Sequence, residues 1–151
     1  MALETTLILC KPDAVSRSLV GEIISRIERR GYVITAMKLT QLDGDKAREH
    51  YAEHNGKPFF NDLVSFITSG ALVALAVEGE GVIDGMRQMI GATNPLTAAP
   101  GSIRGDFGQT IGYNMVHGSD SKGSAERELK IFFNANEFVS RKHDLQRWLA
   151  D

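Results

Sequence analysis

The chain has 151 residues, of which 42% are hydrophobic and 24% are charged, and its formal net charge is −2. This length is enough for one hydrophobic core, so a single domain over residues 1–151 is expected, and the composition excludes a disordered chain. The near-neutral charge gives no global electrostatic reason to expect binding to nucleic acid or to a membrane, so any anion site must be local.

Cysteine usage and the first residues indicate the compartment. Cys10 is the only cysteine, which rules out an intrachain disulfide and favours a reducing environment. Residues 1–4 carry an acid and lack the basic start of a signal peptide, and no apolar run approaches the about 20 residues that span a bilayer. A cytoplasmic protein without a membrane span is therefore expected.

The first part of the chain alternates between extended and helical patterns. A β-branched apolar run predicts a buried strand over residues 5–10, which ends at a turn that begins with Lys11. Helical spacing of apolar residues predicts a helix over 20–30, and Gly31 ends it. Extended character returns over residues 32–40, which predicts a second strand.

The middle of the chain continues the alternation. A helix is expected over residues 43–54, with Tyr51 near its end, and another over residues 61–69. An apolar strand over 71–77 follows, and then a helix over 81–90. The regular change from strand to helix indicates a mixed α and β protein.

The last part of the chain contains a long connection and one further helix. Arg87 lies off the apolar stripe of the preceding helix. Residues 91–112 are rich in Gly, Pro, Thr and Asn, and connections of this length are usually functional or disordered. Residues 114–117 are short and partly apolar, and residues 119–121 offer N-caps for a helix. This order places His117 just before a helix start.

The surroundings of His117 suit phosphate chemistry, although neither Gly-rich phosphate-binding pattern occurs in the chain. Neutral imidazole is a competent nucleophile near pH 7, and a helix N-terminus favours an arriving anion. Glu128 lies about two turns into the following helix and could face back to hold the other ring nitrogen, with Ser119 orienting the carboxylate. Taken alone, however, a single histidine is more often structural.

The other histidines lack this context. They are assigned to solvated surface or helix-side positions: His50, His54 and His143. No role is assigned to residues 54–57.

Several sequence blocks resemble those of one enzyme family. The pattern N-x-x-H-G-S-D-S over residues 114–121 resembles the active-site signature of nucleoside diphosphate kinases at every fixed position. Further blocks match in the same order, namely residues 6–15, 58–60, 91–95 and 103–107. The resemblance implies an enzyme that moves the γ-phosphate of a nucleoside triphosphate, usually ATP, to a nucleoside diphosphate by a ping-pong mechanism.

The resemblance also implies roles for individual residues. His117 matches the phosphorylated histidine, and Glu128 with Ser119 matches the pair that positions it. Lys11 matches a lysine that contacts the transferred phosphate and the ribose 3′-hydroxyl, and Tyr51 a tyrosine close to the transferred group. Four more residues match contacts to the outer phosphates and the ribose: Arg87, Thr93, Arg104 and Asn114.

The base and metal contacts follow from the same resemblance. Phe59 matches the residue whose ring stacks on the nucleobase, and Leu63 with Ile111 would line the same slot. Stacking is tolerant of base identity because every base has a π-face. Mg²⁺ would arrive on the nucleotide phosphates, and Asp120 could assist it through water or act only as a helix cap.

The resemblance implies an α/β (α+β) fold of the ferredoxin-like βαββαβ form, with a four-stranded antiparallel sheet covered by helices. It also implies a homo-oligomer, for which a hexamer is favoured and a tetramer or dimer remains open. Residues 93–100 resemble a subunit-contact loop. Residues 134–151, with a small helix around Trp148, form a C-terminal extension that packs on the body or on a neighbouring subunit.

Two alternatives from other classes remain open. A binding protein that lost catalysis would show a replaced nucleophile or phosphate contact, and none is visible. A nucleic-acid binder would show affinity for single strands that falls steeply with salt, and nucleic-acid binding is not expected as the main function.

Overall fold

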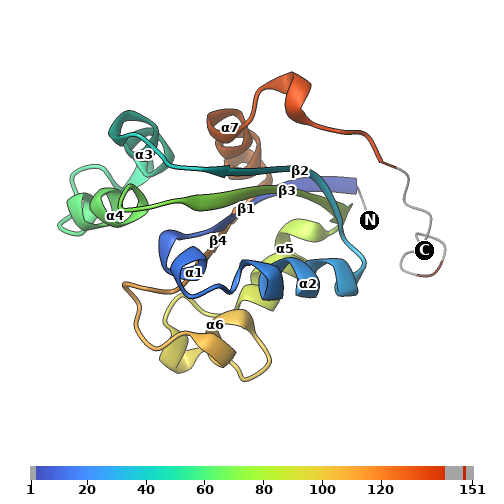
Figure 1. The fold of residues 1–151 in the computed structure, drawn as a ribbon, viewed down its shortest axis with the longest axis horizontal. Helices are drawn as coiled ribbons and strands as arrows, with labels where there is room; N and C mark the ends of the chain where they lie inside the picture. The colour runs from blue at the N-terminus through green and yellow to red at the C-terminus, as the bar shows by residue number, and fades with distance from the viewer. Residues whose placement is uncertain (1–2, 142–147, 149–151) are drawn as a thin grey trace.

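One antiparallel sheet with helices on both of its faces forms the body of the protein (Figure 1). The computed structural model describes residues 3–141 and 148. The sheet has the strand order β2-β3-β1-β4, from strands β1 (Leu3–Cys10), β2 (Val33–Thr40), β3 (Leu72–Glu80) and β4 (Val116–Gly118). The predicted four-stranded antiparallel sheet of a ferredoxin-like α/β fold is confirmed.

The helices divide between the two faces because β1 is apolar on both. One layer contains α2 (Val20–Arg30) and α5 (Val82–Ile90); the other contains α3 (Gly44–His50), α4 (Phe60–Ile67) and α7 (Lys122–Phe132). Side chains alternate along a strand, so Ile8 and Cys10 enter the core under α2 and α5. Leu7 and Leu9 enter the second core, with α3, α4 and α7.

Local signals explain most of the helix boundaries. Gly31 ends α2 with φ of 99°, a left-handed conformation that costs glycine little. The side chain of Asp43 accepts a hydrogen bond from the backbone N–H of Lys46 at 2.8 Å and caps α3. However, α3 ends at His50, and residues Ala52–His54 form a separate 3-10 turn, so the single helix expected over 43–54 was wrong in its second half.

Two helices lie where only a turn and a connection were expected. The chain enters α1 (Pro12–Ser16) directly after β1, with Pro12 at its first position. The glycine-rich connection contains a 3-10 turn at Pro95–Thr97 and α6 (Ile103–Phe107), which the side chain of Ser102 caps. Both helices are too short for hydrophobic periodicity to show.

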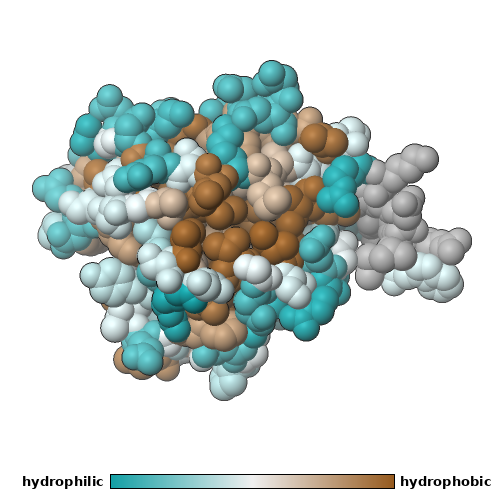
Figure 2. Space-filling model, viewed as in Figure 1, coloured by the Kyte–Doolittle hydropathy of each residue, from teal (hydrophilic) through white to brown (hydrophobic). Residues whose placement is uncertain are grey.

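The edge strand β2 presents exposed apolar side chains, chiefly Met37 and Leu39. Figure 2 shows a hydrophobic patch on the face of the molecule where β2 runs. A bulge between Ile34 and Ala36 interrupts the pairing with β3, and there the backbone N–H of Val139 donates to the carbonyl of Thr35 at 2.8 Å. Part of this sheet edge is therefore covered by the chain's own C-terminal segment.

The C-terminal segment is described only in part. It includes a 3-10 turn at Ala135–Glu137, and the ammonium of Lys38 on β2 contacts Glu137 at 2.8 Å. Trp148 is exposed. His143 lies outside the described residues. Apart from Trp148 itself, so does the small helix that was expected around it. Across the described helices, none combines the length and apolar character that crossing a bilayer requires.

Candidate active site

The pairing of β1 with β4 places Lys11 and His117 on the same face of the sheet. Leu9 lies opposite His117 in this antiparallel pair, so their side chains share a face. Lys11 lies two residues beyond Leu9, and its backbone N–H donates to the carbonyl of Met115 at 2.8 Å. A cation and an imidazole therefore lie on one face of the sheet, at the end of the central strand β1 and of its edge neighbour β4.

Glu128 on α7 orients the ring of His117 through a contact with Nε2. The Nε2 atom of His117 lies 2.8 Å from Oε1 of Glu128. The same oxygen accepts a hydrogen bond from the hydroxyl of Ser119 at 2.7 Å. Ser119 is itself fixed to β1, because its hydroxyl accepts from the backbone N–H of Leu7 at 3.3 Å. The predicted backward reach of Glu128 is thus present in the structure.

The charge on Glu128 assigns the proton on the imidazole. Burial alone would raise the pKa of the Glu128 carboxyl, but the hydrogen bond and charge of His117 outweigh burial and lower it. An ionised carboxylate only accepts hydrogen bonds, so the proton between the two groups belongs to Nε2 of His117. When the His117 imidazole is neutral, the other ring nitrogen, Nδ1, carries the free lone pair.

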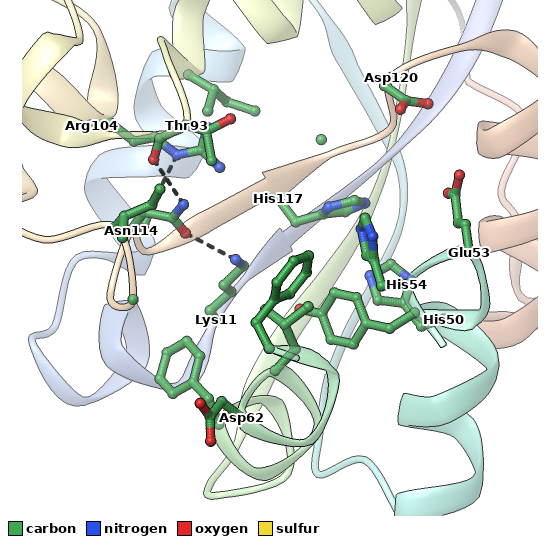
Figure 3. A pocket seen from close by; sticks show the side chains of 18 of the residues that line it. Lys11, His50, Glu53, His54, Asp62, Thr93, Arg104, Asn114, His117 and Asp120 are labelled. Atoms are coloured by element: carbon green, nitrogen blue, oxygen red, sulfur yellow. Dashed lines mark hydrogen bonds between the residues drawn. The ribbon is translucent and has the colours of Figure 1, made fainter. Parts of the chain in front are cut away.

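Lys11 is buried and held by Asn114. Its ammonium donates to Oδ1 of Asn114 at 2.9 Å, and the amide of Asn114 donates to the carbonyl of Thr93 at 3.0 Å (Figure 3). Burial, and next to it the nearby charge of Arg104, lower the pKa of Lys11 to about 8. The connection that carries Thr93 and the strand end that carries Lys11 are thereby tied together.

Arg104 is locked by backbone carbonyls rather than exposed. It is 7% exposed, and its guanidinium donates to the carbonyls of Asn114, Gly91 and Val116 at 3.2, 3.1 and 2.6 Å. A guanidinium has five N–H groups, so two remain to bind a ligand. Arg87 is exposed, as its place off the apolar stripe predicted, and donates to the carbonyl of Gly118 at 3.3 Å.

Aromatic and aliphatic side chains form the other end of the site. Phe59, at the N-cap of α4, is 46% exposed, and Ile111 is 60% exposed. Leu63 lies one helical turn after Phe59. Apolar groups held open to solvent in this way suit a flat apolar ligand surface.

His50 is not the solvated residue that its sequence neighbours suggested. It is 2% exposed, and its ring stands edge-on to that of His117, with centroids 4.7 Å apart. Burial lowers its pKa to about 3, with the charge of His117 as the next cause, so it is neutral. Tyr51 packs on it at 4.7 Å, and the buried Tyr51 hydroxyl has no hydrogen-bond partner among the described residues.

These side chains line one cavity of about 690 Å³. It contains every residue predicted for the site except Ser119, which lies behind Glu128: Lys11, Tyr51, Phe59, Leu63, Arg87, Thr93, Arg104, Ile111, Asn114, His117, Asp120 and Glu128. The size suits a ligand as large as a nucleotide. The lining also contains His50 and His54, which the sequence interpretation had placed elsewhere.

The helix cap beside His117 is Ser121, whose hydroxyl accepts from the backbone N–H of Ser124 at 3.1 Å. Asp120 is exposed in the cavity wall. A hydrogen bond from Ser124 lowers the pKa of Asp120, and the charge of Arg87 lowers it further. Asp120 therefore offers an ionised carboxylate on the cavity side of the helix start.

Comparison with known proteins decides the family. The nucleoside diphosphate kinase family model matches residues 4–138. The chain belongs to this family. It is 53% identical over 149 residues to a nucleoside diphosphate kinase of Staphylococcus aureus strain MSSA476. The matched region covers 99% of this chain and 100% of that protein. Family membership makes the chain a phosphotransferase with nucleotide substrates.

Solved structures of family members have the same fold. A halophilic nucleoside diphosphate kinase from Halobacterium salinarum, solved in complex with CDP, is 44% identical with a TM-score of 0.96, over 99% of this chain and 100% of that one. A nucleoside diphosphate kinase family protein from Babesia bovis is 39% identical with a TM-score of 0.94, over 97% and 99%.

Proposed function

We propose that His117 carries the phosphoryl group between two nucleotides that visit one site in turn. The observation that carries this proposal is the 2.8 Å contact between Nε2 of His117 and the ionised Glu128 carboxylate. Because that contact keeps the proton on Nε2, Nδ1 retains a lone pair and acts as the nucleophile.

Each half of the reaction exchanges one bond for another. In the first half, the Nδ1 lone pair forms a bond to the γ-phosphorus of a nucleoside triphosphate, usually ATP, and the bond to the bridging oxygen breaks. The nucleoside diphosphate leaves with that electron pair. In the second half, a terminal oxygen of another nucleoside diphosphate attacks the phosphorus and the P–N bond breaks. Glu128 offsets the positive charge on the imidazole during transfer.

The cations of the cavity stabilise the phosphoryl group in transit. A loose transition state spreads negative charge over three equatorial oxygens. Lys11 and Arg104 are already oriented by hydrogen bonds, so little reorganisation accompanies the reaction. Arg87 and Thr93 hold the next phosphate, and Asn114 and Lys11 hold the ribose. The hydroxyl of Tyr51 has no hydrogen-bond partner among the described residues, and burial raises its pKa to about 12, so it stays protonated and donates to the transferred group.

Mg²⁺ fits the oxygen groups at this site. Mg²⁺ prefers oxygen ligands and keeps several waters, and the ionised Asp120 carboxylate in the cavity wall supplies such an oxygen. Asp120 would hold the ion through water while the nucleotide phosphates bind it directly. The ion would neutralise phosphate charge.

The nucleobase stacks on Phe59, beside Leu63 and Ile111. This slot offers apolar surface rather than a set of buried hydrogen-bonding groups, which supports low base specificity. The enzyme would then maintain pools of ribo- and deoxynucleoside triphosphates.

We also propose a cytoplasmic homo-oligomer, with a hexamer favoured over a tetramer or dimer. The exposed Met37 and Leu39 on the edge strand and the exposed Leu96 in the 93–100 loop support self-association. The free, buried Cys10 suits a reducing compartment. Residues 1–151 would act as one domain, with residues 134–151 as an extension on the body or a neighbour. Multi-angle light scattering measures the subunit count.

Incubation with γ-labelled ATP and Mg²⁺ tests the proposed mechanism. We expect an acid-labile, base-stable phosphate on the protein, which chases to added nucleoside diphosphate, and no label on His117→Ala. The thermal unfolding midpoint of the variant would show that it is folded. Full exchange activity in His117→Ala, or an unlabelled wild-type enzyme, would overturn the mechanism.

A further inference from the structure

The turn between α3 and α4 leads to Phe59, the ring proposed to stack on the nucleobase, but residues 54–57 of this turn have no role in the mechanism above. Phe59 is about half exposed. Gly56, with φ of 87°, reverses the chain, and the backbone N–H of Lys57 donates to the carbonyl of His54 at 3.0 Å. This turn brings the side chains of His54 and Lys57 to the same ring.

Three contacts connect these side chains. The ammonium of Lys57 lies 5.7 Å from the centroid of the Phe59 ring, within the range of a cation–π interaction. It also lies 3.2 Å from Nδ1 of His54, which accepts a hydrogen bond from the ammonium when Nδ1 carries no proton. The ring of His54 lies 5.5 Å from that of Phe59. Lys57, His54 and Phe59 thus form a closed triangle of contacts.

The cavity lies on one side of this triangle. His54 and Phe59 belong to the described residues that line the cavity, whereas Lys57 does not. The ammonium therefore contacts the ring of a cavity residue without itself belonging to the described cavity lining. His54 also contacts Tyr51, with centroids 6.3 Å apart, so the triangle is anchored to the buried aromatic residues beside His117.

We propose that His54 and Lys57 are positioning residues that hold the Phe59 ring ready for the nucleobase. The proposal rests on the proposed stacking role of Phe59. An exposed ring that is fixed before the nucleotide arrives loses less side-chain freedom on binding, so affinity rises without a new contact to the nucleotide. Because Lys57 is not among the described residues that line the cavity, its removal should act on nucleotide binding and not on phosphoryl transfer.

Single-turnover phosphorylation of His117 separates these two effects. Lys57→Met keeps the length of the side chain and removes its charge. We expect the half-saturating ATP concentration to rise about 2- to 5-fold, the value of an exposed cation–π contact, while the maximal rate stays within 2-fold. Lys57→Arg should restore wild-type binding because it keeps a cation over the ring. Lys46→Met, which removes an exposed charge on α3, should change neither value.

A phosphate donor that lacks a nucleobase distinguishes positioning of the Phe59 ring from simple attraction of the phosphates by the Lys57 charge. Ribose 5-triphosphate should phosphorylate Lys57→Met and wild type alike, and Lys57→Met should add nothing to Phe59→Leu in a double-mutant cycle. Equal losses with ribose 5-triphosphate and ATP, or no loss with ATP, would overturn the proposal. A wild-type enzyme that acquires no phosphate on His117 would instead be a failure of the proposed function.

Discussion

The two ends of the cavity are built on opposite principles. At the phosphate end, Lys11 and Arg104 are buried and each is hydrogen-bonded to the protein before any ligand arrives. At the base end, Phe59 and Ile111 are largely exposed and contribute apolar surface. One end is a fixed set of charges and the other is an open apolar slot.

Under the proposed function, this difference would let one site select phosphates and tolerate different bases. Charges that are already oriented stabilise a transferring phosphoryl group strongly, and they do so for every nucleotide because all share the phosphate chain. An apolar slot gains from stacking but reads no hydrogen-bonding edge. Substitutions at the phosphate end should therefore be costly, and substitutions at the base end mild.

The largest effect is expected from Arg104→Ala. The change leaves the carbonyls of Asn114, Gly91 and Val116 without their partner and removes a cation that the proposed function assigns to the phosphates. We expect kcat/KM to fall about 10³-fold and the free energy of unfolding to fall by about 2–4 kcal/mol. Steady-state kinetics and urea unfolding measure the two. Arg29→Ala, at an exposed arginine, serves as the control; equal behaviour of the two variants would contradict the buried role.

Glu128→Gln should have the next largest effect. The amide keeps the shape of the carboxyl but removes the charge that supports Nε2–H and the phosphorylated imidazole. We expect the rate of His117 phosphorylation to fall about 10²-fold, with ATP binding changed little. Rapid-quench measurement of labelled protein gives the rate. A drop confined to ATP binding would show that the carboxylate does not act through His117.

A pH profile tests the buried state of Lys11. Its pKa is about 8, so the side chain is charged below that pH and becomes neutral as pH rises through it. We expect kcat/KM, which reports the free enzyme, to fall above about pH 8, approaching tenfold per pH unit. His50, with a pKa of about 3, should contribute no limb near neutrality. A flat profile to pH 10 would contradict the burial of the Lys11 charge.

Phe59→Ala should have the smallest effect. Loss of one stacking ring should raise KM by about 10-fold, and by similar factors for purine and pyrimidine diphosphates, with kcat nearly unchanged. Steady-state assays with ADP, GDP, CDP and UDP as acceptors provide the measurement. A loss restricted to one base would mean that the slot reads base identity and would remove the contrast between the two ends.

Much of the fold and of the site could be predicted because the responsible signals are local. Strand β1 follows from a run of apolar residues, and the end of α2 follows from Gly31. The contact of His117 with Glu128 follows from helix geometry, since the glutamate lies about two turns into α7. The family resemblance extended this local interpretation to residues that are far apart in the chain.

The predictions that the structure contradicts depend on contacts between segments that are distant in the chain. His50 has charged neighbours in sequence, yet it is buried because α3 turns that face toward Phe132 and His117. The helix predicted over residues 43–54 is too long, because no capping residue or helix-breaking residue in the sequence indicates that α3 ends at His50. The sequence around His54 and Lys57 did not indicate that these side chains contact each other and Phe59, because the contacts depend on the path of the turn around Gly56.

The sequence by itself determined the four strands and most of the longer helices, and it pointed to His117 as the proposed nucleophile, since these signals depend on neighbours within a few turns. Only the tertiary structure decided that Lys11 and Arg104 are buried cations, that His50 is neutral beside His117, and that Lys57 and His54 contact the Phe59 ring. The physical reason is that burial, pKa and ring packing depend on segments distant in the chain, which come together only when the sheet and its helices assemble.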